Sequence, residues 1–149
     1  MISNVLCKNI FKTHLKHIAF AINTDGINDE GIAGKIASMY IPKFSNTGER
    51  KLGDVVTITF KGKSYHGLVC HSLSPKGWKN SPTAIKRCID KIRITDNDEI
   101  AIVLLGAGKV GKRMGADIKG NLRAINRSKK KCVVYTIDYS QEEVLRMLK

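Results

Sequence analysis

The chain has 149 residues, 42% of them hydrophobic, which suits one globular domain and excludes a protein with two lobes around a cofactor. It carries 26 Lys and Arg residues against 13 Asp and Glu residues, and this formal net charge of +13 predicts a polyanionic partner. No stretch approaches the roughly 18 consecutive apolar residues of a transmembrane helix, so we expect no membrane partner.

The N-terminal segment is basic and contains no acidic residue. Leu6, Ile10 and Leu15 stand at near-helical spacing with lysines between them, a pattern typical of an organelle transit peptide. We therefore assign residues 1–17 to a leader and residues 18–149 to the folded domain. The segment lacks Arg and is poor in Ser and Thr, so a basic N-terminal arm or a first core segment is an equally good interpretation.

Beyond this segment the sequence predicts short strands and little helix. The predicted strands are residues 36–41, 55–60, 64–71, 100–105 and 132–137. Lys61-Gly62-Lys63 joins the second and third of these strands as a hairpin, and Ser140 to Glu143 read as a capping box that begins a short C-terminal helix. Many short strands with little helix predict a mainly β protein, a barrel or sandwich rather than a doubly wound sheet.

Residues that often hold metals or act as nucleophiles form no clear site. The four cysteines are scattered without a C-x-x-C pair, which predicts free thiols in a reducing compartment. His66, Cys70 and His71 lie close in sequence, but on a strand His71 points to the opposite face from the other two. We therefore expect no catalytic residue, no metal and no cofactor.

A glycine motif follows the apolar residues 100–105. Gly106-Ala-Gly108-Lys-Val-Gly111 matches the fingerprint of dinucleotide-binding enzymes, which requires a helix after the third glycine and an acid about 20 residues later. Gly115 and Gly120 would interrupt that helix at about 1 kcal/mol each relative to Ala, and three lysines stand where the acid belongs. A small dinucleotide-binding enzyme is thus the less favoured alternative.

Cations gather in two segments rich in Gly, Ser and Asn, which we interpret as loops that neutralise phosphates. Aromatic residues make up 6% of the chain, which argues against a stacking platform for single-stranded bases and favours recognition of folded RNA. Together with the hairpin lysines, the candidate RNA-binding residues are Lys61, Lys63, Lys76, Lys79, Lys86, Arg87, Lys109, Lys112, Arg113, Lys119, Arg123, Arg127, Lys129 and Lys130.

Several short motifs occur in a suggestive order. Lys51-Leu-Gly53-Asp54 precedes a strand, the Lys-Gly-Lys turn follows it, and Gly108 to Arg113 follow the later apolar strand. In this order they resemble the universal large-ribosomal-subunit protein family numbered fourteen, in particular its mitochondrial branch. The likeness extends over about residues 18–145.

This resemblance implies a small five-stranded β-barrel with projecting basic loops and a short C-terminal helix, without catalytic activity. It implies a structural role in the large ribosomal subunit, bound to its ribosomal RNA and neighbouring proteins and facing small-subunit RNA across the interface. Lys112 and Arg113 match the surface that docks a ribosome-silencing factor. The implied location is the mitochondrial matrix rather than a plastid or the cytoplasm. A non-ribosomal basic RNA-binding barrel, such as an assembly or translation factor, is the main alternative.

Overall fold

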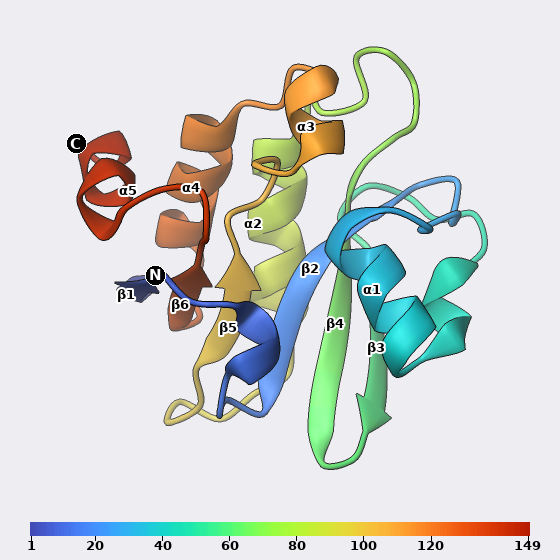
Figure 1. Cartoon of the computed structure of the whole chain (residues 1–149), viewed down its shortest axis with the longest axis horizontal. Coiled ribbons are helices and arrows are strands. Elements are labelled where there is room, and N and C mark those ends of the chain that lie inside the picture. Colours follow the sequence, from blue (N-terminus) through green and yellow to red (C-terminus); the bar gives the residue numbers. More distant parts are fainter.

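The computed structural model describes all 149 residues. A six-stranded sheet runs in the order β1-β6-β5-β2-β4-β3 (Figure 1). Its strands are β1 (Ile2–Leu6), β2 (His17–Asn23), β3 (Val55–Phe60), β4 (Lys63–His71), β5 (Ile100–Val103) and β6 (Cys132–Tyr135). All neighbouring strands are parallel except β3 and β4, which form an antiparallel pair at one edge.

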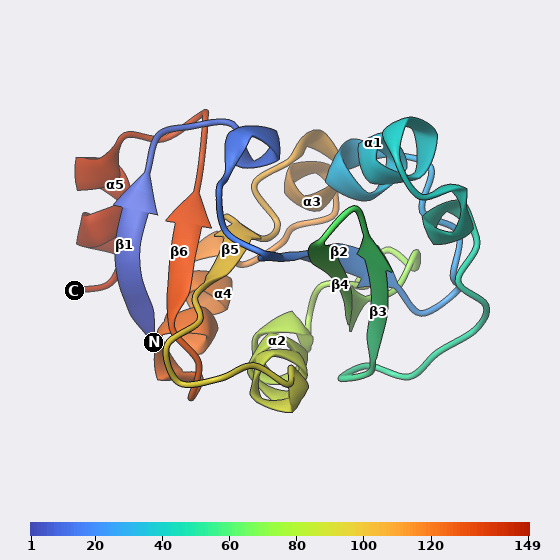
Figure 2. The same cartoon turned by 90° about the horizontal axis from the view of Figure 1, so that it is seen from below.

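Five α-helices and two short 3₁₀ helices connect the strands. They are η1 (Ile10–Lys12), α1 (Gly31–Met39), η2 (Pro42–Ser45), α2 (Ser81–Lys91), α3 (Lys109–Arg113), α4 (Ile118–Arg127) and α5 (Gln141–Met147). Helices α2 and α4 lie side by side on one face of the sheet, and α1 lies on the other (Figure 2).

Apolar side chains of the central strands point alternately to the two faces and build a core on each side. Ala19, Ile100 and Ile102 belong to the core beneath α2 and α4, whereas Ile18 and Phe20 belong to the core beneath α1. Strands buried on both faces are typical of a parallel sheet with helices on both sides. The fold is therefore an open α/β sheet.

The prediction of a mainly β, five-stranded barrel is wrong, because the sheet is open and helices cover both of its faces. Most of residues 36–41, predicted as a strand, lie in α1. The basic segments predicted as loops contain α2 and α4. In α2, Ile85, Cys88 and Ile89 are buried at helical spacing, a signal that the intervening charged residues obscured.

Two local predictions are confirmed. Strands β3 and β4 form the expected hairpin, whose turn places Lys61 and Gly62 at positive φ. At the start of α5, the Glu143 N–H donates to the Ser140 hydroxyl at 3.0 Å, and the Ser140 N–H donates to the Glu143 carboxylate at 3.1 Å. This is the capping box that the sequence predicts.

Residues 1–17, which the sequence assigns to a leader, include the edge strand β1 and the turn η1. Strand β1 pairs in parallel with β6, and the buried hydroxyl groups of Thr13 and Tyr135 lie 2.8 Å apart. The role of this segment as an organelle transit peptide and a mitochondrial location both stay predictions. No helix of the fold combines the length and the apolar character that crossing a membrane requires.

Candidate ligand-binding pocket

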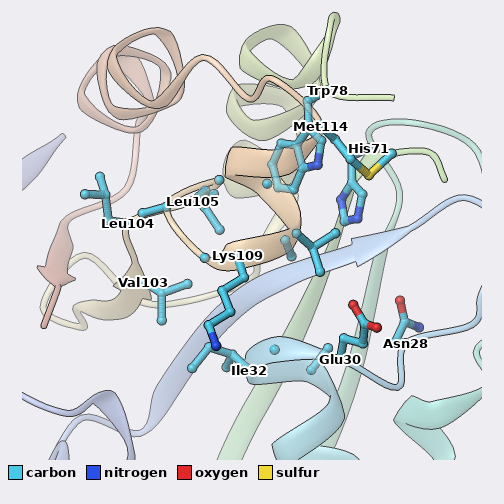
Figure 3. A pocket seen from close by; sticks show the side chains of 18 of the residues that line it. Asn28, Glu30, Ile32, His71, Trp78, Val103, Leu104, Leu105, Lys109 and Met114 are labelled. Atoms are coloured by element: carbon cyan, nitrogen blue, oxygen red, sulfur yellow. The ribbon is translucent and has the colours of Figure 1, made fainter. Parts of the chain in front are cut away.

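A cleft of about 930 Å³ lies at the carboxyl ends of the parallel strands. The loops that follow β2, β4, β5 and β6 line it (Figure 3). In an open sheet with parallel strands, loops at this edge turn toward opposite faces and leave a crevice where ligands bind. The topology thus brings together four segments that are far apart in the sequence.

The turn from β5 into α3 is built on two glycines in close contact. Gly106 has a φ of +86°, and a Cβ on Gly111 would lie 2.5 Å from the Gly106 carbonyl oxygen. The backbone N–H groups of Gly106, Gly108 and Lys109 donate to no acceptor in the chain. Backbone amides gathered at a concave glycine turn bind anions, phosphates in particular.

The turn from β2 into α1 faces the same cleft and is held by two buried asparagines. The Asn23 N–H donates to the Asn28 side-chain oxygen at 3.0 Å, and the Gly26 N–H donates to the Asn23 side-chain oxygen at 2.8 Å. The Asn28 amide group donates to the Phe44 carbonyl at 3.1 Å. These bonds commit the asparagines to shaping the loop.

The same turn supplies a second set of free backbone donors. The N–H groups of Gly31 and Ile32, at the start of α1, find no acceptor within the chain. Both residues line the cleft, as do Gly106 and Gly108 of the other turn. Two separate glycine turns thus offer unpaired amides to one pocket.

Charged side chains surround these amides. The Lys109 side chain extends across the pocket toward Ile32 (Figure 3) and forms no ion pair. At the mouth, a Glu30 carboxylate oxygen lies 4.0 Å from the Arg113 guanidinium, and both side chains are about 70% exposed. This pair links the β2–α1 turn with α3 and is weak, because its atoms are far apart and solvated.

One end of the pocket is formed by His71 and Trp78, whose rings stack with centroids 4.2 Å apart. Burial lowers the pKa of His71 to about 4, against the opposing effect of Asp25, so its imidazole is neutral at pH 7. The Trp78 indole N–H is the one buried side-chain polar atom of the chain without a hydrogen-bond partner. This end of the pocket therefore contains unused polar groups.

The end next to β6 carries an exposed aliphatic side chain among polar ones. Ile137, which follows β6, is 74% exposed, the highest exposure among the large hydrophobic residues. Lys8, Asn9 and Asp138 line the pocket beside it. An exposed aliphatic wall flanked by polar side chains suits a flat, partly polar ring such as a nucleobase.

The structure does not gather all of the candidate RNA-binding residues on one surface. Lys109 and Arg113 line the pocket, and the Lys112 ammonium lies 5.5 Å from the centre of the Tyr139 ring. Lys63 lies at the start of β4 and donates to the Thr13 carbonyl at 2.7 Å. The others lie in the β3–β4 turn, in the β4–α2 loop, or in and after α2 and α4: Lys61, Lys76, Lys79, Lys86, Arg87, Lys119, Arg123, Arg127, Lys129 and Lys130.

Sequence reasoning missed the asparagine turn, the stacked pair and Ile137. One signal was available for the turn, since the apolar residues 18–22 run directly into Asn23-Thr-Asp-Gly26. That is the same succession of apolar strand, glycine turn and helix that occurs at Gly106. Two such units in one chain indicate an α/β sheet.

No protein-family model matches the chain, and no curated protein matches it by sequence. Solved structures do share its fold. The macrodomain of DarG from Thermus aquaticus superposes with a TM-score of 0.67 at 15% identity, covering 91% of this chain and 97% of that one. A Trypanosoma brucei macrodomain in complex with ADP-ribose gives 0.63 at 13% identity, with coverages of 99% and 67%.

An alphavirus protein, P23pro-zbd, gives a TM-score of 0.67 at 16% identity over 97% of this chain. The chain spans 22% of the length of that viral protein. At such identities the similarity establishes the fold alone, and this fold is that of macrodomains.

The identification with a ribosomal protein family is therefore wrong. An α/β macrodomain fold is incompatible with the ribosomal barrel, and the structural role in the ribosome falls with it. The predicted partners were ribosomal RNA, ribosomal proteins and a silencing factor. They depended on that identification and are wrong with it. The observed fold also removes the alternative of a basic RNA-binding barrel. The short motifs behind the resemblance were too local to specify a fold.

Proposed function

We propose that this protein binds ADP-ribose, free or attached to another molecule, in the pocket at the carboxyl edge of the sheet. The observation that carries the proposal is the pair of glycine turns with unpaired N–H groups that line one cleft. A diphosphate matches two facing sets of amide donors. The Trypanosoma brucei macrodomain with the same fold was solved in complex with ADP-ribose.

The remaining groups of the pocket suit the rest of that ligand. The diphosphate lies between the two turns, where the Lys109 ammonium adds a positive charge. The base packs on Ile137, next to the Asp138 carboxylate, which accepts a hydrogen bond from an exocyclic amino group. The terminal ribose points to His71 and Trp78. A cleft of about 930 Å³ falls within the size range of small-molecule sites.

Binding without turnover is the role that the polar groups favour. Asn23 and Asn28 are saturated by loop hydrogen bonds. His71, with its pKa lowered to about 4 by burial, is a weak base at pH 7. We expect an ADP-ribosylated peptide incubated with the protein to stay intact over hours, without release of free ADP-ribose. Release that depends on the protein concentration would contradict this part of the proposal.

Isothermal titration calorimetry with ADP-ribose at pH 7 tests the binding. We expect a dissociation constant in the micromolar range, about −8 kcal/mol, and at least a tenfold weaker constant for adenosine, which lacks the diphosphate. Equal affinities for the two ligands would refute the proposed role of the amide turns.

A matched pair of glycine variants sharpens this test. Gly108 has an ordinary φ of −72°, and a Cβ there meets nothing within 4 Å. Gly108→Ala should therefore keep its stability yet lose about tenfold in affinity, about 1.4 kcal/mol, because the methyl group enters the space of the diphosphate. Gly62→Ala, at a φ of +78° in the distant β3–β4 turn, should lower stability and leave the affinity unchanged.

A further inference from the structure

The outer surface of α2 and α4 is strongly basic and lies away from the pocket. We define the α2–α4 face as the outward side chains of these two helices and of the turn after α4. Residues 81–91 and 118–131 contain nine Lys and Arg residues and a single acid, Asp90. Figures 1 and 2 show both helices side by side on the face of the sheet opposite to α1.

The cations of this face occupy helix positions away from the buried ones and so point outward. Ile85, Cys88 and Ile89 of α2 face the core, as do Leu122 and Ile125 of α4. The outward positions of α4 then carry cations four residues apart, about 6 Å along the axis. These cations are Lys119, Arg123 and Arg127, and the outward and lateral positions of α2 carry Lys86, Arg87 and Lys91.

Few of these charges are neutralised inside the chain. Only four of the 26 Lys and Arg residues form ion pairs, and two of those four lie on this face. Lys86 contacts Asp90 at 2.7 Å, and Lys91 lies 4.0 Å from Asp54. Mutual repulsion among so many like charges destabilises the folded chain. A polyanionic partner would reverse the sign of this electrostatic contribution.

We propose that the α2–α4 face binds the phosphate backbones of double-stranded nucleic acid. Neither helix nor the turn contains an aromatic residue, so the face has no platform on which single-stranded bases could stack. Packed helices lie roughly 8–10 Å apart. Lys and Arg side chains of both helices can therefore reach phosphates of one duplex at the same time.

This surface is independent of the proposed ADP-ribose pocket. The pocket is lined by loops at the carboxyl edge of the sheet, and no residue of α2 or α4 lines it. Loss of one binding activity therefore leaves the other measurable. Circular dichroism and urea unfolding, which depend on neither binding activity, serve as the control for correct folding.

Fluorescence anisotropy with a labelled duplex of about 20 base pairs tests the proposal. DNA and RNA duplexes of one sequence, and the single DNA strand, separate the sources of a phosphate backbone. Contact with four or more phosphates predicts at least a hundredfold loss of affinity between about 50 and 200 mM salt. Affinity that is independent of salt, or tighter binding of the single strand, would overturn the proposal.

Charge-reversal variants locate the site. Lys119 and Arg127 are exposed and form no ion pair within the chain. The double variant Lys119→Glu/Arg127→Glu should weaken duplex binding at least tenfold and leave ADP-ribose binding unchanged. The control, Lys35→Glu/Lys43→Glu, makes the same charge change on and beside α1, and should lose less than threefold.

Three results would reject the α2–α4 face as the duplex site. One is an equal loss of duplex affinity in both double variants. Another is no detectable duplex binding at about 50 mM salt by protein that unfolds cooperatively in urea. The third is competition by polyglutamate as effective as that by the unlabelled duplex, which would assign the face to acidic proteins.

Discussion

Strand β4 carries two buried histidines that differ in their partners. His66, nearer its amino end, uses both ring nitrogens, with Nε2 at 3.0 Å from His17 and Nδ1 at 2.8 Å from the Thr57 hydroxyl. His71, at the pocket end, has only the Cys70 sulfur at 3.9 Å and the face of Trp78. Burial lowers the pKa of both to about 4.

A perturbed pKa alone therefore does not distinguish a structural group from a ligand-binding group. The pKa of His66 is lowered, and both of its ring nitrogens have hydrogen-bond partners within the chain, so this side chain stabilises the sheet. The pKa of His71 is lowered as well, but its Nε2 has no hydrogen-bond partner in the chain and the residue lines the cleft, so it is available to a ligand. A change of pH and single substitutions at and near the two histidines separate these roles.

Acid should destabilise the protein through both histidines. Each is neutral in the folded protein down to about pH 4, whereas in the unfolded chain it takes up a proton below about pH 6.5. The unfolded state binds more protons in this window, so the free energy of unfolding falls as pH drops from 6.5 to 4. The expected loss is about 3 kcal/mol per histidine.

Urea unfolding followed by circular dichroism at pH 7, 6, 5 and 4.5 measures this loss. His66→Gln should reduce the pH dependence of the free energy of unfolding by about half, because only His71 then titrates in this range. A free energy of unfolding that is constant across this range would contradict the burial of neutral imidazoles.

His66→Ala should destabilise the protein at pH 7 and spare the pocket. The change opens a cavity and leaves His17 and Thr57 without their partner, which costs about 2–3 kcal/mol. Urea unfolding measures the free energy, and calorimetry should find an ADP-ribose affinity within twofold of the original. A large loss of affinity would show that the two ends of β4 are not separate.

His71→Phe should have the reverse profile. The aromatic ring keeps its packing on Trp78 but loses the nitrogens that face the ligand. We expect a change in stability below about 1 kcal/mol and an affinity for ADP-ribose lower by about five- to tenfold, near 1 kcal/mol. Unchanged affinity would remove His71 from the binding site.

Glu30→Gln should give the smallest effect, a gain of affinity. Its carboxylate lies at the mouth, 4.0 Å from Arg113, and it repels an incoming diphosphate while competing for the guanidinium. Removing the charge should improve binding about two- to fivefold, less than 1 kcal/mol. Glu142→Gln, which removes the exposed partner of Arg146 in α5, is the control and should leave the affinity unchanged.

The sequence was informative where the signal is local. The β3–β4 hairpin and the Ser140 cap depend on neighbouring residues and were predicted correctly. The glycine motif is visible in the sequence, but Gly115 and Gly120 argue against the single long helix that a dinucleotide-binding motif requires. In the structure Gly115 has a φ of +71° after the end of α3, and Gly120 lies in the first turn of α4. They fit two short helices.

The arrangement of the sheet could not be obtained in this way. The parallel pairing of β2 with both β4 and β5 joins strands across long crossovers, and no local pattern encodes their order. The pocket depends on that order, because Asn23, His71, Gly106 and Ile137 lie at or just after the carboxyl ends of four different strands. A list of basic residues likewise contains no information on which helices display them. Only the fold shows which of the basic residues share a surface.

The stacking of Trp78 on His71 has a practical consequence. Trp78 is the only tryptophan of the chain and lies 5% exposed at the end of the pocket. Its emission is therefore an intrinsic optical probe of one location rather than an average over the molecule. Protonation of the stacked imidazole should quench it, and a ligand at this end should shift its wavelength. The protein can thus report occupancy of its own cleft without any attached dye.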